Sequence, residues 1–116
     1  MESTQLEIAL DAVAAARERT ERQIDALQTT VDAIVEAAEL IATDDEHDPE
    51  GATIAYERAQ AIALLRQARA DLDALFETRE QLERRGQVTC EVCAAPIALE
   101  RVAALPTASR CVRCAS

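Results

Sequence analysis

Apolar residues in the first 48 positions recur at alternating steps of four and three. This is the heptad spacing of a helix that packs along one seam. The seam consists of Leu6, Leu10, Val13, Arg17, Thr20, Ile24, Leu27, Val31, Ile34, Ala38 and Ile41. Nine of these eleven residues are apolar, and the segment contains no glycine or proline. The pattern predicts one long helix, with Thr4 and Glu7 as a capping box at its start.

A second seam with the same spacing runs through residues 52–85, which also lack glycine and proline. It consists of Ile54, Arg58, Ala61, Leu65, Ala68, Leu72, Leu75, Arg79 and Leu82, and is widened by Ile62 and Phe76. Tyr56 and Phe76 are interpreted as packing residues on or beside it. Pro49 suits the first turn of a helix, and Gly86 suits the position just after its end. A second helix of similar length is predicted.

The short breaker around Pro49 and Gly51 favours an antiparallel hairpin of the two helices. An intermolecular coiled coil is the alternative, since both seams could serve it. Two helices in contact bury only a thin seam. Something else must therefore stabilise one end of this rod.

All four cysteines lie in the last 27 residues, with the spacing C-x2-C-x17-C-x2-C. They are Cys90, Cys93, Cys111 and Cys114. Two such turns can aim four thiolates at one point, which is the ligand set of a closed, structural Zn²⁺ site. Disulfides or a dithiol redox site are the alternative, but cytosolic disulfides are rare and the sequence shows no export signal. One structural Zn²⁺ is expected, with Arg101, Arg110 and Arg113 available to offset the thiolate charge.

These patterns predict an all-α dominated fold, a long antiparallel coiled-coil helical hairpin with a small C-terminal zinc finger of four cysteines. The hairpin is assigned to residues 1–85, with its tip near residues 44–51, and the finger to residues 86–116. The sequence has no membrane-spanning stretch and no signal peptide, which predicts a cytoplasmic protein. It offers no nucleophile–base pair, no phosphate-binding glycine loop and no open metal position, so no catalysis is expected.

Charge is distributed unevenly along the chain. The 116 residues carry 22 acids and 12 arginines, for a net charge of -10, which disfavours binding to a phosphate backbone. Ten acids and no base lie between residues 23 and 57, so the remaining residues have 12 of each sign and sum to zero. Five of the ten acids lie within residues 44–50. A basic partner surface would attract this segment, although acids at a helix start and in a loop also serve capping and solubility.

The C-terminal part resembles the DksA/TraR family. The matching residues are the two cysteine pairs, Ile97, Arg101, Val102, Ala104, Pro106, Thr107 and Ala108. The resemblance covers roughly the last 70 residues, most specifically in the finger. It implies a monomeric bacterial factor that binds RNA polymerase through the secondary channel, brings an acidic tip near the catalytic centre and makes no sequence-specific DNA contact.

The resemblance also indicates which residues form the tip, and where this chain differs from the family. The family pattern is Asp-x-x-Asp-x-Ala. Starting at Asp48 the chain offers Gly51 and Thr53, and starting at Asp45 it offers Asp48 and Glu50, so either register lacks one feature of the pattern. The expected partner-binding residues are Asp45, Asp48 and Glu50. Ala94 replaces a common glycine that suits a left-handed turn, which predicts a strained or tighter turn. Leu105 replaces a basic residue of members that respond to ppGpp, which disfavours that response. A zinc-stapled coiled-coil adaptor or dimerisation protein, or a thiol redox switch, remains the alternative function.

Overall fold

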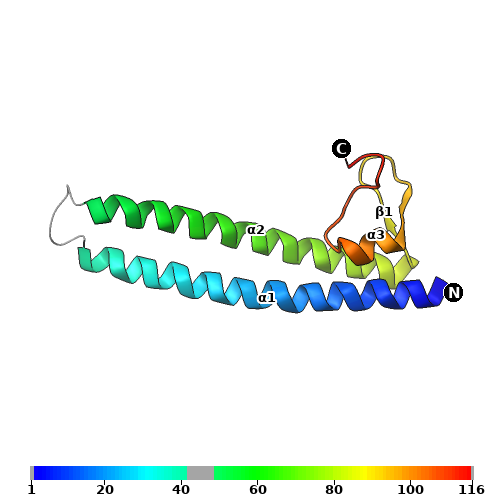
Figure 1. The fold of residues 1–116 in the computed structure, drawn as a ribbon. Coiled ribbons are helices and arrows are strands. Elements are labelled where there is room, and N and C mark those ends of the chain that lie inside the picture. Colours follow the sequence, from blue (N-terminus) through cyan, green and yellow to red (C-terminus); the bar gives the residue numbers. More distant parts are fainter. Residues whose placement is uncertain (1, 42–48, 116) are drawn as a thin grey trace. The chain divides into compact units, whose positions relative to one another are not determined.

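The computed structural model describes residues 2–41 and 49–115. Figure 1 shows two long helices followed by a small C-terminal region. The elements are α1 (Glu2–Ile41), α2 (Pro49–Arg85), β1 (Val88–Thr89), β2 (Pro96–Ile97) and α3 (Leu99–Ala104). The predicted fold class, a long helical hairpin with a small four-cysteine region, is confirmed.

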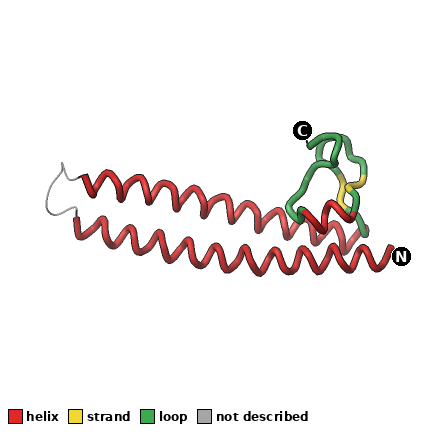
Figure 2. The backbone as a smooth tube through the Cα atoms, in the orientation of Figure 1, coloured by secondary structure: helices red, strands yellow, loops and turns green. Residues whose placement is uncertain are grey.

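The chain divides into two compact units. One consists of Met1–Arg19 with Asp71–Ser116, and the other of Thr20–Ala70. In each unit, a segment of α1 lies beside an antiparallel segment of α2 (Figures 1 and 2). Within the second unit, Nη2 of Arg69 donates a hydrogen bond to Oε1 of Gln28 at 3.1 Å. This bond joins the two helices outside their apolar seam.

The predicted seams form the helix contacts. Every seam residue of α1 from Leu6 to Ala38 is buried or half-buried. On α2 the buried seam residues are Ala61, Leu65, Ala68, Leu75 and Leu82. Arg58 and Arg79 are exposed, and Arg79 pairs with Glu83 at 2.9 Å instead of entering the core. These two arginines at seam positions thus turn towards water, where their charges stay hydrated.

The first unit has a core to which helices and C-terminal region both contribute. Ala9, Val13 and Ala16 of α1 and Leu75 and Leu82 of α2 pack in one cluster with four residues of the C-terminal region. These four are Val88, Cys90, Ile97 and Val102. The two alanines lie outside the predicted seam and are nevertheless buried. The C-terminal region therefore provides the additional support that two helices alone lack.

The two aromatic side chains differ from their predicted role. Tyr56 is 71% exposed, so its interpretation as a packing residue is wrong. Phe76 is 45% exposed and packs only in part. The Arg17 guanidinium lies over its ring, with Cζ 4.7 Å from the ring centroid, within the range of a cation–π interaction. This contact explains an arginine on the α1 seam.

The helix ends follow the sequence signals only in part. α2 begins at Pro49 and ends at Arg85, as predicted. Gly86 adopts a φ of 69°, and its N–H donates to the Leu82 carbonyl at 2.9 Å, which closes the last turn. At the other end, α1 already includes Glu2, so Thr4 lies inside the helix and the predicted capping box is wrong. None of the described helices is long and apolar enough to cross a membrane.

Truncation of a buried leucine of α2 should separate core packing from helix propensity. Leu82 is 1% exposed in the shared core, whereas Leu64 on the same helix is 49% exposed. Leu82→Ala should lower the free energy of unfolding by about 2–5 kcal/mol because it leaves a cavity. Leu64→Ala should change it by no more than about 0.5 kcal/mol. Urea unfolding of the zinc-loaded protein, followed by circular dichroism, measures both, and equal losses would contradict the assigned core.

Candidate metal centre

The four cysteines converge on one point. One sulfur atom from each of Cys90, Cys93, Cys111 and Cys114 lies within 4.8 Å of the other three. Cys93 and Cys111, from different cysteine pairs, have sulfur atoms 3.7 Å apart. A tetrahedron with Zn–S bonds of about 2.3 Å has sulfur–sulfur edges of about 3.8 Å. The donor set and its spacing suit one structural Zn²⁺, as predicted.

Short turns and a two-stranded ladder hold the first cysteine pair. β1 and β2 are antiparallel, with Val88 opposite Ile97 and Thr89 opposite Pro96. Directly after β1, the Cys90 N–H donates to the Ala95 carbonyl at 2.8 Å, and the Ala94 N–H donates to the Cys90 carbonyl at 2.9 Å. The ladder thus closes a tight turn that places both sulfurs on one side.

Ala94 occupies the left-handed region in this turn, with a φ of 63°. Its Cβ makes this conformation costly, as it is for every residue except glycine and, to a lesser degree, asparagine and aspartate. The strain expected from the replacement of the family's glycine is therefore present. The turn keeps its shape because hydrogen bonds on both sides of Ala94 fix it.

The second cysteine pair is joined to the first by backbone and ionic contacts. The Glu91 N–H donates to the Ser109 carbonyl at 2.9 Å, and Nε of Arg110 donates to Oε1 of Glu91, also at 2.9 Å. Nε of Arg101 in α3 donates to the Arg110 carbonyl at 3.0 Å. These bonds link α3 and both cysteine turns into one framework.

The electrostatics of the cluster are uneven. Hydrogen bonds from the backbone N–H groups of Cys93 and Cys111 lower the pKa of the Cys90 thiol to about 6. The neighbouring Cys111 side chain raises the pKa of Cys114 to about 12. Since a metal binds thiolates, its charge must displace the proton of Cys114, whereas Cys90 loses its proton readily.

The three arginines predicted to offset the thiolates have different roles. Arg110 pairs with Glu91, which raises the pKa of its guanidinium, and the sulfurs of Cys90 and Cys114 raise it further. Arg101 caps the Arg110 carbonyl, and Arg113 is exposed. Of the three, Arg110 is thus the one that an ion pair with Glu91 holds beside the cysteine turns, and sequence spacing alone did not distinguish it.

Two polar contacts that periodicity did not reveal attach the finger to the helices. Oε1 of Gln81 in α2 accepts a hydrogen bond from the Thr89 N–H at 3.1 Å. Nε2 of Gln5 in α1 donates to Oε1 of Glu100 in α3 at 3.0 Å. Both glutamines are polar residues on helices, so their sequence positions carry no signal for such contacts.

The predicted partner-binding residues fall at the boundary between the helices. Asp45 and Asp48 lie outside the described residues. Glu50 belongs to the first turn of α2, which begins at Pro49. For the three predicted residues, the structure therefore establishes only that Glu50 is helical.

Fold and site together define a helical protein with a C-terminal zinc-binding finger of four cysteines. Residues 84–116 match the family described as prokaryotic dksA/traR C4-type zinc finger. The finger is therefore of the DksA/TraR type, which confirms the resemblance seen in its residues.

Comparison with solved structures finds chains of similar fold. The chain is similar to the structure of transcription factor DksA2 from Pseudomonas aeruginosa, with 23% sequence identity and a TM-score of 0.47. The similarity covers 89% of this chain and 79% of that chain. No curated protein matches the chain significantly.

Removal of zinc should unfold the finger while most of the helical content persists. The finger buries few apolar side chains, so its order depends on the metal bringing the cysteines together. Chelation should collapse the NMR amide dispersion of residues 87–114 and reduce the helical circular dichroism signal only slightly. Re-addition of Zn²⁺ should restore the spectrum. Retained dispersion in a sample proven free of metal would contradict this dependence.

Ala94→Gly should stabilise the finger. Glycine removes the left-handed penalty of about 1–2 kcal/mol, but it costs about 0.5–1 kcal/mol of chain entropy. The expected net gain in the free energy of unfolding is up to about 1.5 kcal/mol, measured by thermal unfolding of the zinc-loaded protein. Ala95→Gly is the matched control, because Ala95 has no positive φ, and it should destabilise the protein slightly. The same direction of change in both variants would argue against strain at Ala94.

Proposed function

We propose that the chain is a transcription regulator that binds RNA polymerase through its secondary channel. In this proposal the acidic residues 44–50 approach the catalytic centre, and no sequence-specific contact to DNA is made. The observation that carries it is the DksA/TraR-type finger of residues 84–116, which packs into one core with the start of α1 and the end of α2. The protein would act in the cytoplasm as a monomer.

The distribution of charge supports a protein partner in preference to a nucleic acid. All of the net charge of -10 comes from residues 23–57. Such a field repels phosphates and attracts a metal-bearing or basic surface. A polymerase catalytic centre, which works with metal cations, offers that complement.

Exposed apolar side chains within the acidic stretch support the same partner class. Leu40 is 77% exposed and Tyr56 is 71% exposed, and both belong to the second unit. Tyrosine is enriched at the centres of protein interfaces because it buries a large area at low entropic cost. These two residues would add affinity where the acids provide orientation.

Each part of the chain has a separate role in this proposal. Residues 1–85 are the hairpin that enters the polymerase, and residues 86–116 are the finger that stabilises its base. Cys90, Cys93, Cys111 and Cys114 hold one structural Zn²⁺. Asp45, Asp48 and Glu50 act on the partner. With Leu105 in place of a basic residue, no response to ppGpp is proposed.

The direct test is co-elution of the zinc-loaded full chain with core RNA polymerase from its own organism. A known secondary-channel factor serves as competitor. Binding that the competitor displaces would support the proposal. With zinc confirmed, no binding at micromolar concentration would overturn it and favour the adaptor function.

Asp48→Asn should weaken the transcriptional effect severalfold while leaving polymerase binding and helicity unchanged. It removes one charge from the segment that approaches the catalytic centre and little of the binding surface. Asp73→Asn is the matched control, because Asp73 is an exposed acid of α2 in the other unit. Multi-round transcription on several promoters measures both variants. Unchanged transcription with a lowered melting temperature would instead indicate that Asp48 only caps α2.

A further inference from the structure

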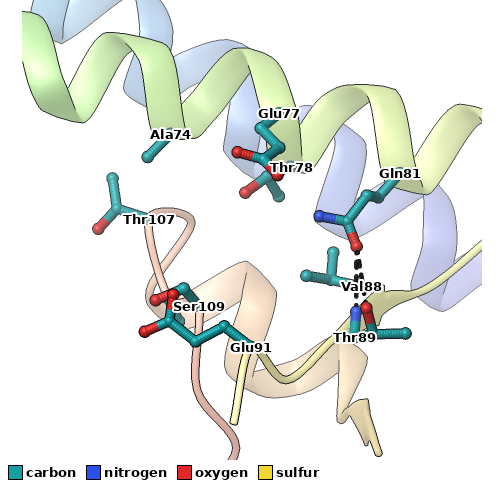
Figure 3. A pocket seen from close by; sticks show the side chains of 10 residues that line it. Ala74, Glu77, Thr78, Gln81, Val88, Thr89, Glu91, Thr107 and Ser109 are labelled. Carbon is teal, nitrogen blue, oxygen red and sulfur yellow. Dashed lines mark hydrogen bonds between the residues drawn. The ribbon is translucent and has the colours of Figure 1, made fainter. Parts of the chain in front are cut away.

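A small polar cleft lies between α2 and the finger. Its volume is about 200 Å³, and Figure 3 shows its lining side chains. Glu77 and Thr78 of α2 face Glu91, Thr107 and Ser109 of the finger across it. All of these residues belong to the first unit.

The charge of the cleft is negative. Two of its lining residues, Glu77 and Glu91, carry carboxylates, and none of them is basic. Glu91 is already bonded to Arg110, which stands outside the lining. Glu77 forms no ion pair or hydrogen bond within the described part of the chain, in contrast to Glu80 one turn on, which pairs with Arg84 at 2.9 Å. Glu77 therefore contributes an uncompensated charge.

A threonine with little exposed surface lies beside this charge. Thr78 is only 5% exposed and is the one buried polar residue among those described. Within the described ranges its hydroxyl has no hydrogen-bond partner, although Thr29 and Thr30 bond the backbone carbonyls four residues earlier. The Thr78 side chain lines the cleft instead. No fully buried side-chain polar atom of the described residues lacks a partner, so this hydroxyl is reached from the cleft, where a bound side chain can hydrogen-bond to it.

The size and chemistry of the cleft limit its occupant. Pockets for drug-sized molecules have volumes of about 300–1,000 Å³, so this cleft suits a single side chain. Two carboxylates and several hydroxyl oxygens accept hydrogen bonds and favour a cation. The planar guanidinium group of arginine presents five donors in a fixed fork, which matches carboxylate and hydroxyl acceptors on two walls.

We infer that the cleft receives an arginine side chain of the protein to which this chain binds. Glu77 is its charge partner, and the hydroxyl groups of Thr78 and Ser109 accept further hydrogen bonds. The inference deepens the proposed function and rests on it for the identity of the partner, RNA polymerase. The finger then contributes to binding as well as to stability.

The first experiment uses the full zinc-loaded chain and a small probe, N-acetyl-arginine amide. NMR titration should give saturable shifts at the amides of Thr78 and Ser109. The neutral analogue N-acetyl-citrulline amide should give none. Glu77→Gln should weaken arginine binding roughly five- to tenfold through loss of a charge-assisted bond, and Glu80→Gln should leave it unchanged. Equal shifts from both probes, or an unchanged affinity of Glu77→Gln, would overturn the inference.

Thr78→Val distinguishes a ligand-binding hydroxyl from a structural one. Because the hydroxyl has no internal partner, the isosteric apolar side chain should keep or raise the melting temperature. The same variant should bind the arginine probe more weakly. A lowered melting temperature with unchanged probe binding would show that the hydroxyl serves the fold alone.

A binding experiment with core RNA polymerase separates this inference from the proposed function. Glu77→Arg should bind core polymerase at least about tenfold more weakly than the wild type, because like charges meet in the cleft. Glu80→Arg is the control and should bind nearly as the wild type does. Equal binding by Glu77→Arg and wild type would overturn the inference and leave the proposed function standing. Failure of the wild type to bind would overturn the proposed function, and with it the assignment of polymerase as the partner.

Discussion

The first unit depends on the convergence of four sulfur atoms. The finger contains two strands of two residues each and a helix of six, and its main buried residues are Val88, Ile97 and Val102. This apolar burial is small against the conformational entropy of about thirty ordered residues. A metal held by the four cysteines supplies the missing free energy. Only when the finger is ordered can it complete the core that it shares with the two helices.

That dependence explains which parts of the fold could be predicted from the sequence. A heptad seam forms against a single neighbouring helix, so the heptad spacing alone predicted the contacts between α1 and α2 correctly. Ala9 and Ala16 escaped prediction because they belong to a core that the C-terminal region shares, and the periodicity of one helix does not register that region. Tyr56 was misassigned for the opposite reason, since an aromatic residue beside a seam can face water or a partner.

The candidate site was predictable in its ligands and less so in its surroundings. The spacing of the cysteine pairs dictates convergence, whereas the choice of Arg110 over Arg101 and Arg113 depends on where a hydrogen bond to Glu91 directs the guanidinium. The left-handed conformation of Ala94 was foreseeable only through the family's glycine. Glu77 and Thr78 carry no motif, because a cleft between a helix and a finger exists only after both have folded.

The metal centre and the cleft are coupled, because residues that line the cleft stand next to the metal ligands in the sequence. Glu91 follows Cys90 directly, and Ser109 stands two positions before Cys111, so one wall of the cleft is built from the cysteine turns. The hydrogen bond from the Glu91 N–H to the Ser109 carbonyl holds that wall together. Loss of the metal would release both turns and remove the wall, while Glu77 and Thr78 would stay on α2. An arginine-binding function of the cleft would therefore require zinc even though no metal ligand touches the arginine.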